Sequence, residues 1–368
     1  MSANPHAPRN NPLARALAAD IAATGPVPVA VYMARAAEAY YAQQQPFGRE
    51  GDFITAPGIS QMFGEMIGAW LADIWFQSGS PPAVNLIELG PGMGTLSADI
   101  LRTIAAWPDF KKSVTLHLVE TSDRLIGKQK NILSNENVVW HKSIDDVPRG
   151  FSLVVANEFF DALPVHQYIK QNGSWHERMV GHDPISDRFF FTTTGAGEAG
   201  NMLALDGSIF ETSPVSHDIV DVLARRINAD GGAALIIDYG HSRPGFGDTF
   251  QALYRHESVD PLDDPGGRDV TAHVDFATLA AIARQHAAVS NIVPQGVFLS
   301  ALGIAVRAAR LCTIATAAQR EGIMSALARL TAPAQMGALF KVMAITPKAA
   351  IIKPAGFEAA RQDEVFDG

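Results

Sequence analysis

Residues 84–95 decide the fold, and they read Val-Asn-Leu-Ile-Glu-Leu-Gly-Pro-Gly-Met-Gly-Thr. The run Val84 to Leu89 is largely apolar, which favours a short buried strand. Glycines follow it at positions 90, 92 and 94, and the next stretch, Thr95 to Ala106, has the apolar spacing of a helix. Glycine adopts positive φ readily and lets the backbone approach a ligand closely. We therefore expect a strand, a tight turn and a helix that together form part of a ligand site.

The same alternation of strand and helix continues along the chain. Short runs that are apolar on both faces are typical of a buried parallel sheet, and their alternation with helical segments predicts a doubly wound α/β fold. Further strands are expected at Val114–Val119, Val138–Trp140, Phe151–Ala156, Ala233–Ile237 and Ala338–Ile345.

Regions outside this alternation predict the domain organisation. Residues 1–80 are expected to form a helical N-terminal extension or lid, because apolar residues recur there at three- and four-residue steps. The core is expected over 81–346, with a β-rich insertion at 165–215, where Asn-Gly at 172–173 predicts a hairpin turn. A second, helical insertion is expected at 241–335, and residues 347–368 are expected to form a surface tail.

The composition excludes some classes of function. The chain has 368 residues, with 29 Lys and Arg against 38 Asp and Glu, and its net charge of −9 disfavours a general nucleic-acid binder. A single cysteine, Cys312, excludes internal disulfides and cysteine-based zinc sites. The histidines lack the spacing of common metal motifs, so no metal is predicted. No apolar run reaches the roughly 18 residues of a membrane span.

The N-terminal residues carry a weak signal for location. Residues 1–12 lack the apolar segment of a secretory signal, and they show no clear transit peptide. A cytoplasmic location is therefore favoured, and the family resemblance described below implies the mitochondrial matrix for a eukaryotic source. The sequence leaves the oligomeric state open.

The glycine spacing separates two kinds of nucleotide ligand. The dinucleotide fingerprint G-x-G-x-x-G/A would place a third small residue at position 95, which is threonine. The pattern E-x-G-x-G-x-G instead resembles motif I of class I S-adenosylmethionine-dependent methyltransferases, and this resemblance implies a Rossmann-like core. An acid at the end of the next strand can accept both ribose hydroxyls. The predicted cofactor-binding residues here are Glu88, Gly90, Pro91, Gly92, Gly94 and Glu120. The alternative is an ordinary tight turn followed by a solvated acid.

Longer motifs make the resemblance more specific. The resemblance to the MidA-type family extends from about residue 13 to 346, and the similar segments are 51–57, 59–65, 88–92, 157–165, 237–240, 269–276 and 336–341. It implies S-adenosyl-L-methionine as cofactor and symmetric dimethylation of a protein arginine. The mitochondrial members assist assembly of respiratory complex I, so a peripheral-arm subunit of that complex is the implied protein partner.

The residues after the strand at 151–156 are candidates for the chemistry. Guanidinium is planar and stays protonated, and carboxylates bind it through paired hydrogen bonds. Glu158 is our first candidate for its partner and Asp161 the second carboxylate, while Asn157 could orient the target nitrogen or contact the cofactor. Phe159 could wall the substrate pocket. The alternative is that Phe159 and Phe160 belong to the core and Asp161 caps a turn.

Other candidates depend on their place at predicted strand ends or on the family motifs. Asp238 and Tyr239 could contact substrate, and His273 could accept a proton. Gln61 could reach over the cofactor as part of a lid. Each also has a purely structural alternative: Tyr239 as an ordinary aromatic at a strand end, His273 as a packing or helix-capping residue, and Gln61 as a helix cap. A non-catalytic cofactor-binding assembly factor and a small-molecule methyltransferase also remain open, because a fold does not determine a substrate.

Overall fold

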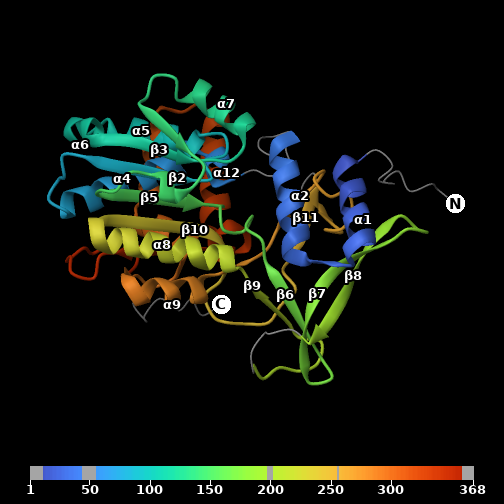
Figure 1. Ribbon diagram of the computed structural model, residues 1–368. Helices are drawn as coiled ribbons and strands as arrows, with labels where there is room; N and C mark the ends of the chain where they lie inside the picture. The colour runs from blue at the N-terminus through green and yellow to red at the C-terminus, as the bar shows by residue number, and fades with distance from the viewer. Residues whose placement is uncertain (1–10, 44–54, 197–201, 255–256, 359–368) are drawn as a thin grey trace, which may run out of the picture.

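A sheet of nine strands forms the centre of the computed structural model, which describes residues 11–43, 55–196, 202–254 and 257–358 (Figure 1). Its main strands run in the order β4-β3-β2-β5-β10-β17. The first five are parallel, and β17 is antiparallel to β10. Because β2 lies between β3 and β5, the order in which the chain adds strands to the sheet reverses there, and ligands bind in doubly wound sheets at such a switch point. The predicted doubly wound fold is confirmed.

The strands lie close to their predicted positions. Alternate side chains of each strand enter opposite cores: Leu86 and Leu235 face one apolar cluster, and Ile87 and Ile236 face the other. The sheet strands are β2 (Val84–Leu89), β3 (Val114–Val119), β4 (Val138–His141), β5 (Ser152–Asn157), β10 (Gly232–His241), β14 (Val274–Asp275), β15 (Ala288–Val289), β16 (Val293–Pro294) and β17 (Phe340–Thr346).

Helices cover both faces of this sheet, which gives three layers (Figure 1). One face is covered by α8 (Pro214–Asp230) and α9 (Phe276–His286). The helices of the other face are α4 (Gln61–Gln77), α5 (Thr95–Ile104), α6 (Pro108–Ser113), α10 (Gln295–Ala301), α11 (Ile304–Ile314) and α12 (Ala317–Thr331). Short helical turns complete the unit at α3 (Ala56–Ile59), η1 (Ile144–Asp146) and η2 (Pro333–Gly337), and α7 (Asp123–Ile132) follows β3.

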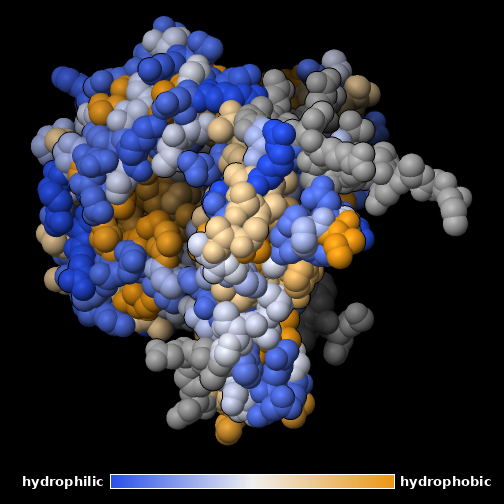
Figure 2. Space-filling model, turned by 45° about the vertical axis from the view of Figure 1, so that its right-hand side comes forward, coloured by the Kyte–Doolittle hydropathy of each residue, from blue (hydrophilic) through white to orange (hydrophobic). Residues whose placement is uncertain are grey.

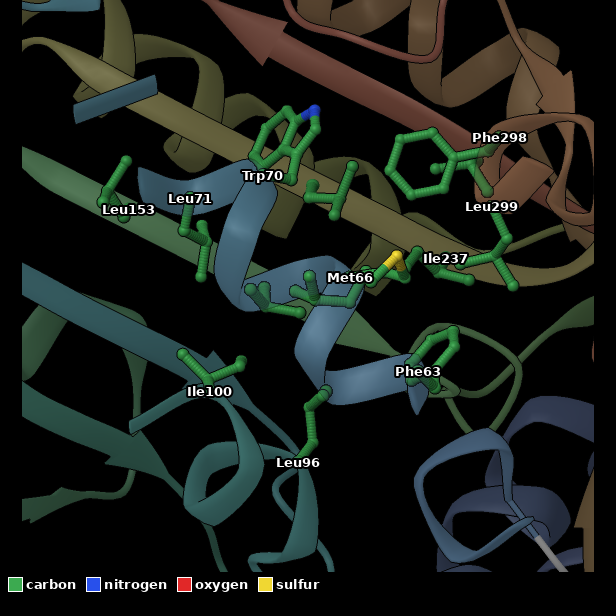
Figure 3. Close-up of a cluster of buried hydrophobic side chains, with 14 of the residues drawn as sticks. Phe63, Met66, Trp70, Leu71, Leu96, Ile100, Leu153, Ile237, Phe298 and Leu299 are labelled. Carbon is green, nitrogen blue, oxygen red and sulfur yellow. The ribbon is translucent and has the colours of Figure 1, made fainter. Parts of the chain in front are cut away.

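Helix α4 is part of the core, although it lies within the predicted N-terminal extension. Figure 3 shows Met66 of α4 beside Ile237 of the sheet and Leu71 of α4 beside Leu153, and Phe63 and Trp70 belong to the same apolar cluster. The helix predicted here from apolar residues at three- and four-residue steps is confirmed, and its apolar face packs against the sheet.

A smaller unit lies beside the sheet and joins segments far apart in sequence (Figure 1). The N-terminal helices α1 (Pro12–Thr24) and α2 (Val29–Gln43) share an apolar core with the β-rich insertion. Asn172 and Gly173 both take positive φ between two paired strands, so the predicted hairpin turn is present. The strands of this sheet are β1 (Val27–Pro28), β6 (His166–Gln171), β7 (Ser174–Asp183), β8 (Arg188–Ala196) and β9 (Ile209–Thr212).

Two expectations about the later chain need correction. The insertion at 241–335 begins with a three-stranded sheet of β11 (Gln251–Tyr254), β12 (Glu257–Val259) and β13 (Asp269–Thr271), so it is not simply a loop followed by helices. Strands β11, β12 and β13 are too short to show an alternating apolar pattern within a glycine- and proline-rich stretch. The tail is also partly packed, because Phe357 is 6% exposed and Trp70 donates a hydrogen bond to the Ala355 carbonyl.

In the described residues, no single helix is long and apolar enough to cross a membrane, and only α10 with α11, bent by 66°, meets that test as a pair on length and composition.

Candidate active site

The turn after β2 requires its glycines. Gly90, Gly92 and Gly94 have φ of +62°, +52° and +82°, in the left-handed region that side chains rarely adopt. A Cβ at Gly90 would also lie 2.8 Å from Cδ2 of Phe159. The predicted tight turn therefore exists, and it brings the backbone against the loop that follows β5.

A pocket of about 500 Å³ opens over this turn. Its size lies within the range of small-molecule and cofactor sites. The glycine loop, the end of β5, α3 and α12 all contribute to its wall, and Figure 2 shows the molecule hollowed beside the N-terminal helices, with apolar side chains inside. The predicted residues that share this pocket are Glu88, Gly90, Pro91, Gly92, Asn157 and Glu158.

Glu88 supplies a buried carboxylate at the floor of the pocket. It is 5% exposed, and Ser97 donates a hydrogen bond to its Oε2. Burial raises the pKa of Glu88 to about 7, although the Ser97 bonds favour the ionised form. No cation within the described residues pairs with this carboxylate. The ammonium of an amino-acid moiety fits this position, because it would stabilise the charge that burial disfavours.

Glu120 lies at the end of β3, behind the glycine loop. It accepts hydrogen bonds from Ser122 N (2.8 Å) and Gln129 Nε2 (3.2 Å), and burial raises its pKa. Gln129 Nε2 also donates to the Gly92 carbonyl (2.8 Å), so it connects the acid to the loop. Neither Glu120 nor Gly94 lines the pocket, and Glu120 as a ribose ligand stays a prediction.

Asp238 stabilises the loop after β5 by accepting hydrogen bonds from its backbone. Oδ2 of Asp238 accepts hydrogen bonds from the backbone N–H groups of residues 159, 160 and 161, at 3.1, 2.9 and 3.2 Å. Its Oδ1 accepts the Tyr239 N–H, and Asp238 is fully buried. The structure thus places Asp238 under the loop, where its oxygens are occupied by backbone donors, instead of facing a substrate as we expected.

These bonds fix an unusual backbone at Glu158, which has φ of +52°. Its Oε1 accepts hydrogen bonds from Ala56 N (2.9 Å) and Asn157 Nδ2 (3.2 Å). Burial raises the pKa of Glu158 to about 7, and the charge of Asp161 adds to the rise, while Arg329 opposes it. Glu158 is therefore a carboxyl group whose ionisation is balanced near neutral pH.

Around Glu158, Asp161 and Tyr239, four buried side-chain oxygen atoms have no hydrogen-bond partner within the described residues. The atoms are Asn157 Oδ1, Asp161 Oδ1, Tyr239 OH and Thr271 Oγ1. Tyr239 lies close to Asp161 and Thr271. Burial raises the pKa of Asp161 to about 6. Buried oxygens are normally satisfied, so this group suits a ligand rich in N–H donors.

Other predicted residues lie elsewhere. Gln61 is exposed and donates to Glu65 (3.3 Å), so it does not line the pocket. His273 lines a separate cavity of about 190 Å³, and its ring centre is 5.3 Å from that of Tyr239. Phe160 is 2% exposed within the core. Residues 51–54 of the first family motif lie outside the described residues.

Helix α12 contributes to the pocket in a way that the sequence does not predict. Gly322, Ser325, Ala326 and Arg329 line the pocket, although they lie more than 200 residues after the glycine loop. Their local pattern indicates only a helix. No sequence signal linked this helix to the pocket, because only the packing of the helical insertion brings it there.

Comparison with known proteins agrees with this geometry. A family model described as "Putative S-adenosyl-L-methionine-dependent methyltransferase" matches residues 66–295. The Drosophila melanogaster protein named "Protein arginine methyltransferase NDUFAF7 homolog, mitochondrial" is 39% identical, with 91% of this chain and 85% of that protein aligned. The human "Protein arginine methyltransferase NDUFAF7, mitochondrial" is 35% identical, with 96% and 88% aligned.

A solved structure is similar over almost the whole chain. The crystal structure of a Burkholderia thailandensis protein bound to S-adenosyl-homocysteine has 28% identity and a TM-score of 0.79, covering 95% of this chain and 93% of that one. The curated relatives are named as mitochondrial, so our preference for a cytoplasmic location is not supported. The fold, the glycine turn and these relatives agree on S-adenosylmethionine as the cofactor. The chain belongs to this family of S-adenosyl-L-methionine-dependent methyltransferases.

Proposed function

We propose that this enzyme is a protein-arginine methyltransferase, and that Glu158 binds the guanidinium of the substrate. The observation that carries the proposal is that Glu158 lines the same pocket as the glycine turn, with unpartnered buried oxygens beside it. A guanidinium has five N–H donors and no acceptor, and it matches a set of buried oxygen atoms. The names of the fly and human relatives support the same substrate class.

The carboxylates have two tasks in this proposal. When bound, S-adenosylmethionine supplies the methyl group as an electrophilic carbon on its sulfonium. Glu158 and Asp161 hold the guanidinium by charge-assisted hydrogen bonds, and they orient one nitrogen toward that carbon. The positive charge of the guanidinium in turn favours the ionised form of both acids.

The same acids can take up the proton that leaves the methylated nitrogen. The pKa of Glu158 is raised to about 7 and that of Asp161 to about 6, and general bases work best with values near the operating pH. Phe159 packs beside Gly90 at the boundary between the glycine turn and this loop, where an aromatic ring helps to exclude water.

The finer features of the function rest on the family resemblance. We propose that the product is symmetric dimethylarginine and that the substrate is a peripheral-arm subunit of respiratory complex I. We further propose the mitochondrial matrix as the location in a eukaryotic source, in keeping with the names of the relatives. The net charge of −9 favours the approach of a basic segment of such a subunit.

The test is transfer of a labelled methyl group from S-adenosylmethionine to purified peripheral-arm subunits, followed by mass spectrometry of the modified residue. We expect label on arginine as the symmetric dimethyl product. Glu158→Gln should lower kcat by roughly 100-fold or more, because it removes the charge that orients the guanidinium.

A matched control is Glu257→Gln, since Glu257 is exposed on β12. It should transfer methyl groups at the unmodified rate. Label on lysine, or on small molecules only, would exclude the proposed substrate class. Full activity of Glu158→Gln, with arginine still labelled, would instead remove Glu158 from the mechanism.

A further inference from the structure

Helix α12 brings a positive charge into the cofactor pocket. Arg329 is a cationic side chain in the pocket wall, in which the carboxylates are Glu88 and Glu158. It is close enough to Glu158 to oppose the rise in the pKa of that acid. Among the described residues, however, no hydrogen bond or ion pair engages the Arg329 guanidinium. A partly buried guanidinium with free donors is available to an anionic group of a ligand.

The charges of the pocket are complementary to those of the cofactor. S-adenosylmethionine carries two positive groups, the sulfonium and the ammonium, and one negative group, the carboxylate. The pocket wall presents two carboxylates and one guanidinium. Without a cation, the cofactor carboxylate would enter a site that already holds two acids, and like charges in such a site repel strongly.

The position of Arg329 agrees with the expected direction of the cofactor. If Glu120 at the end of β3 contacts the ribose, the amino-acid part extends toward the end of β5. Asn157 and Glu158 form that end of the pocket, and Arg329 lies beside Glu158. At this end of the pocket, the carboxylate of the cofactor's amino-acid part requires a hydrogen-bond donor.

The surrounding helices hold α12 in place. The neighbouring Leu330 is fully buried, and Gln295 Nε2 donates to its carbonyl (2.9 Å). Helix α11, which packs on α12, is tied to α4 by Arg307, whose Nε and Nη2 donate to Glu65 at 2.7 and 2.9 Å. The backbone that carries Arg329 is therefore held in place by packing, so the position of its side chain does not depend on a loop.

We propose that Arg329 binds the carboxylate of the cofactor's amino-acid moiety, so that the helical insertion, and not only the glycine turn, determines recognition of S-adenosylmethionine. This role of Arg329 in binding the cofactor is independent of the identity of the protein substrate.

The test compares two probes by calorimetry, S-adenosylmethionine and decarboxylated S-adenosylmethionine, which keeps the sulfonium and the amine but lacks the carboxylate. In the unmodified protein the first should bind more tightly. Arg329→Gln should weaken S-adenosylmethionine about 10- to 100-fold and leave the decarboxylated probe within about twofold, since a hydrogen bond to a charged group contributes about 1.5–3 kcal/mol. Retained binding of the decarboxylated probe also shows that the variant is folded.

Two further variants complete the experiment. Arg320→Gln changes another arginine of α12, which is exposed and donates to the Ala315 carbonyl, and it should change neither affinity. Arg329→Lys keeps the charge and should retain part of the preference for the carboxylate, and it replaces Arg329→Gln if that variant does not fold. Equal weakening of both probes, or unchanged affinity for S-adenosylmethionine, would overturn the proposal.

Discussion

Single residues in this protein have environments that make specific predictions. Glu88 is an acid whose pKa is about 7 in the folded chain, against an ordinary value of 4.5. Between these values the folded chain holds a proton that the unfolded chain releases, so its stability falls as pH rises through that range. Glu88→Gln should remove this contribution, and the unfolding free energy of the variant should exceed that of the unmodified protein more at pH 8 than at pH 5. Urea unfolding at both pH values measures this.

Cofactor affinity should show the opposite pH dependence. The ammonium of the cofactor requires an ionised Glu88, so affinity for S-adenosylhomocysteine should rise between pH 5.5 and 7, approaching tenfold per pH unit if Glu88 alone titrates. Calorimetry across this range measures the slope, and Glu88→Gln should flatten it. An unchanged slope in the variant would mean that another group, such as Glu158, carries the dependence.

The glycine turn makes a prediction at the same scale. Gly90→Ala places a Cβ 2.8 Å from Phe159 and requires a residue at φ +62°. We expect weaker binding of S-adenosylhomocysteine by tenfold or more, because the turn must shift to relieve the contact. Gly127→Ala is the matched control, since nothing lies near its Cβ in α7; it should keep full affinity and gain about 0.5–1 kcal/mol in stability. Normal affinity of Gly90→Ala would show that the turn tolerates displacement.

At the scale of elements, α4 and α5 approach closely because α4 has glycines on the facing side. A Cβ at Gly64 would lie 2.4 Å from the Asp99 Cβ, and one at Gly68 would lie 2.9 Å from the Thr103 Cβ. Gly64→Ala should therefore separate the two helices and lower the unfolding free energy by about 1–3 kcal/mol, despite the better helix propensity of alanine. Urea unfolding would detect this, and a neutral or stabilised variant would contradict the close contact.

At the scale of the whole molecule, the N-terminal helices and the β-rich insertion share a core that is separate from the sheet. Tyr32 is fully buried there and donates to the Pro261 carbonyl (3.0 Å). Tyr32→Ala should cost about 3–5 kcal/mol locally and accelerate hydrogen exchange in α1, α2 and β6–β9. Exchange in β2, β3 and β5, and affinity for S-adenosylhomocysteine, should change little. Uniform acceleration throughout would show that the two units unfold together.

Local patterns in the amino-acid sequence are sufficient to predict the sheet, the glycine turn and the family. These features depend on local patterns, such as apolar runs for strands, glycines for positive φ and Asn-Gly for a hairpin, which act over a few residues. The acids at the ends of β2 and β5 followed from the same patterns, because parallel strands bring their carboxyl ends to one edge.

Which of these residues share a cavity depends on long-range packing, which local patterns do not reveal. Glu158 and Arg329 are 171 positions apart, and their proximity depends on the packing of α12 across the sheet edge. Asp238 turned inward because three successive backbone N–H groups needed an acceptor, and His273 lines a different cavity. Local sequence encodes local backbone, whereas the direction of a side chain is set by long-range packing and by the need to satisfy every buried polar group.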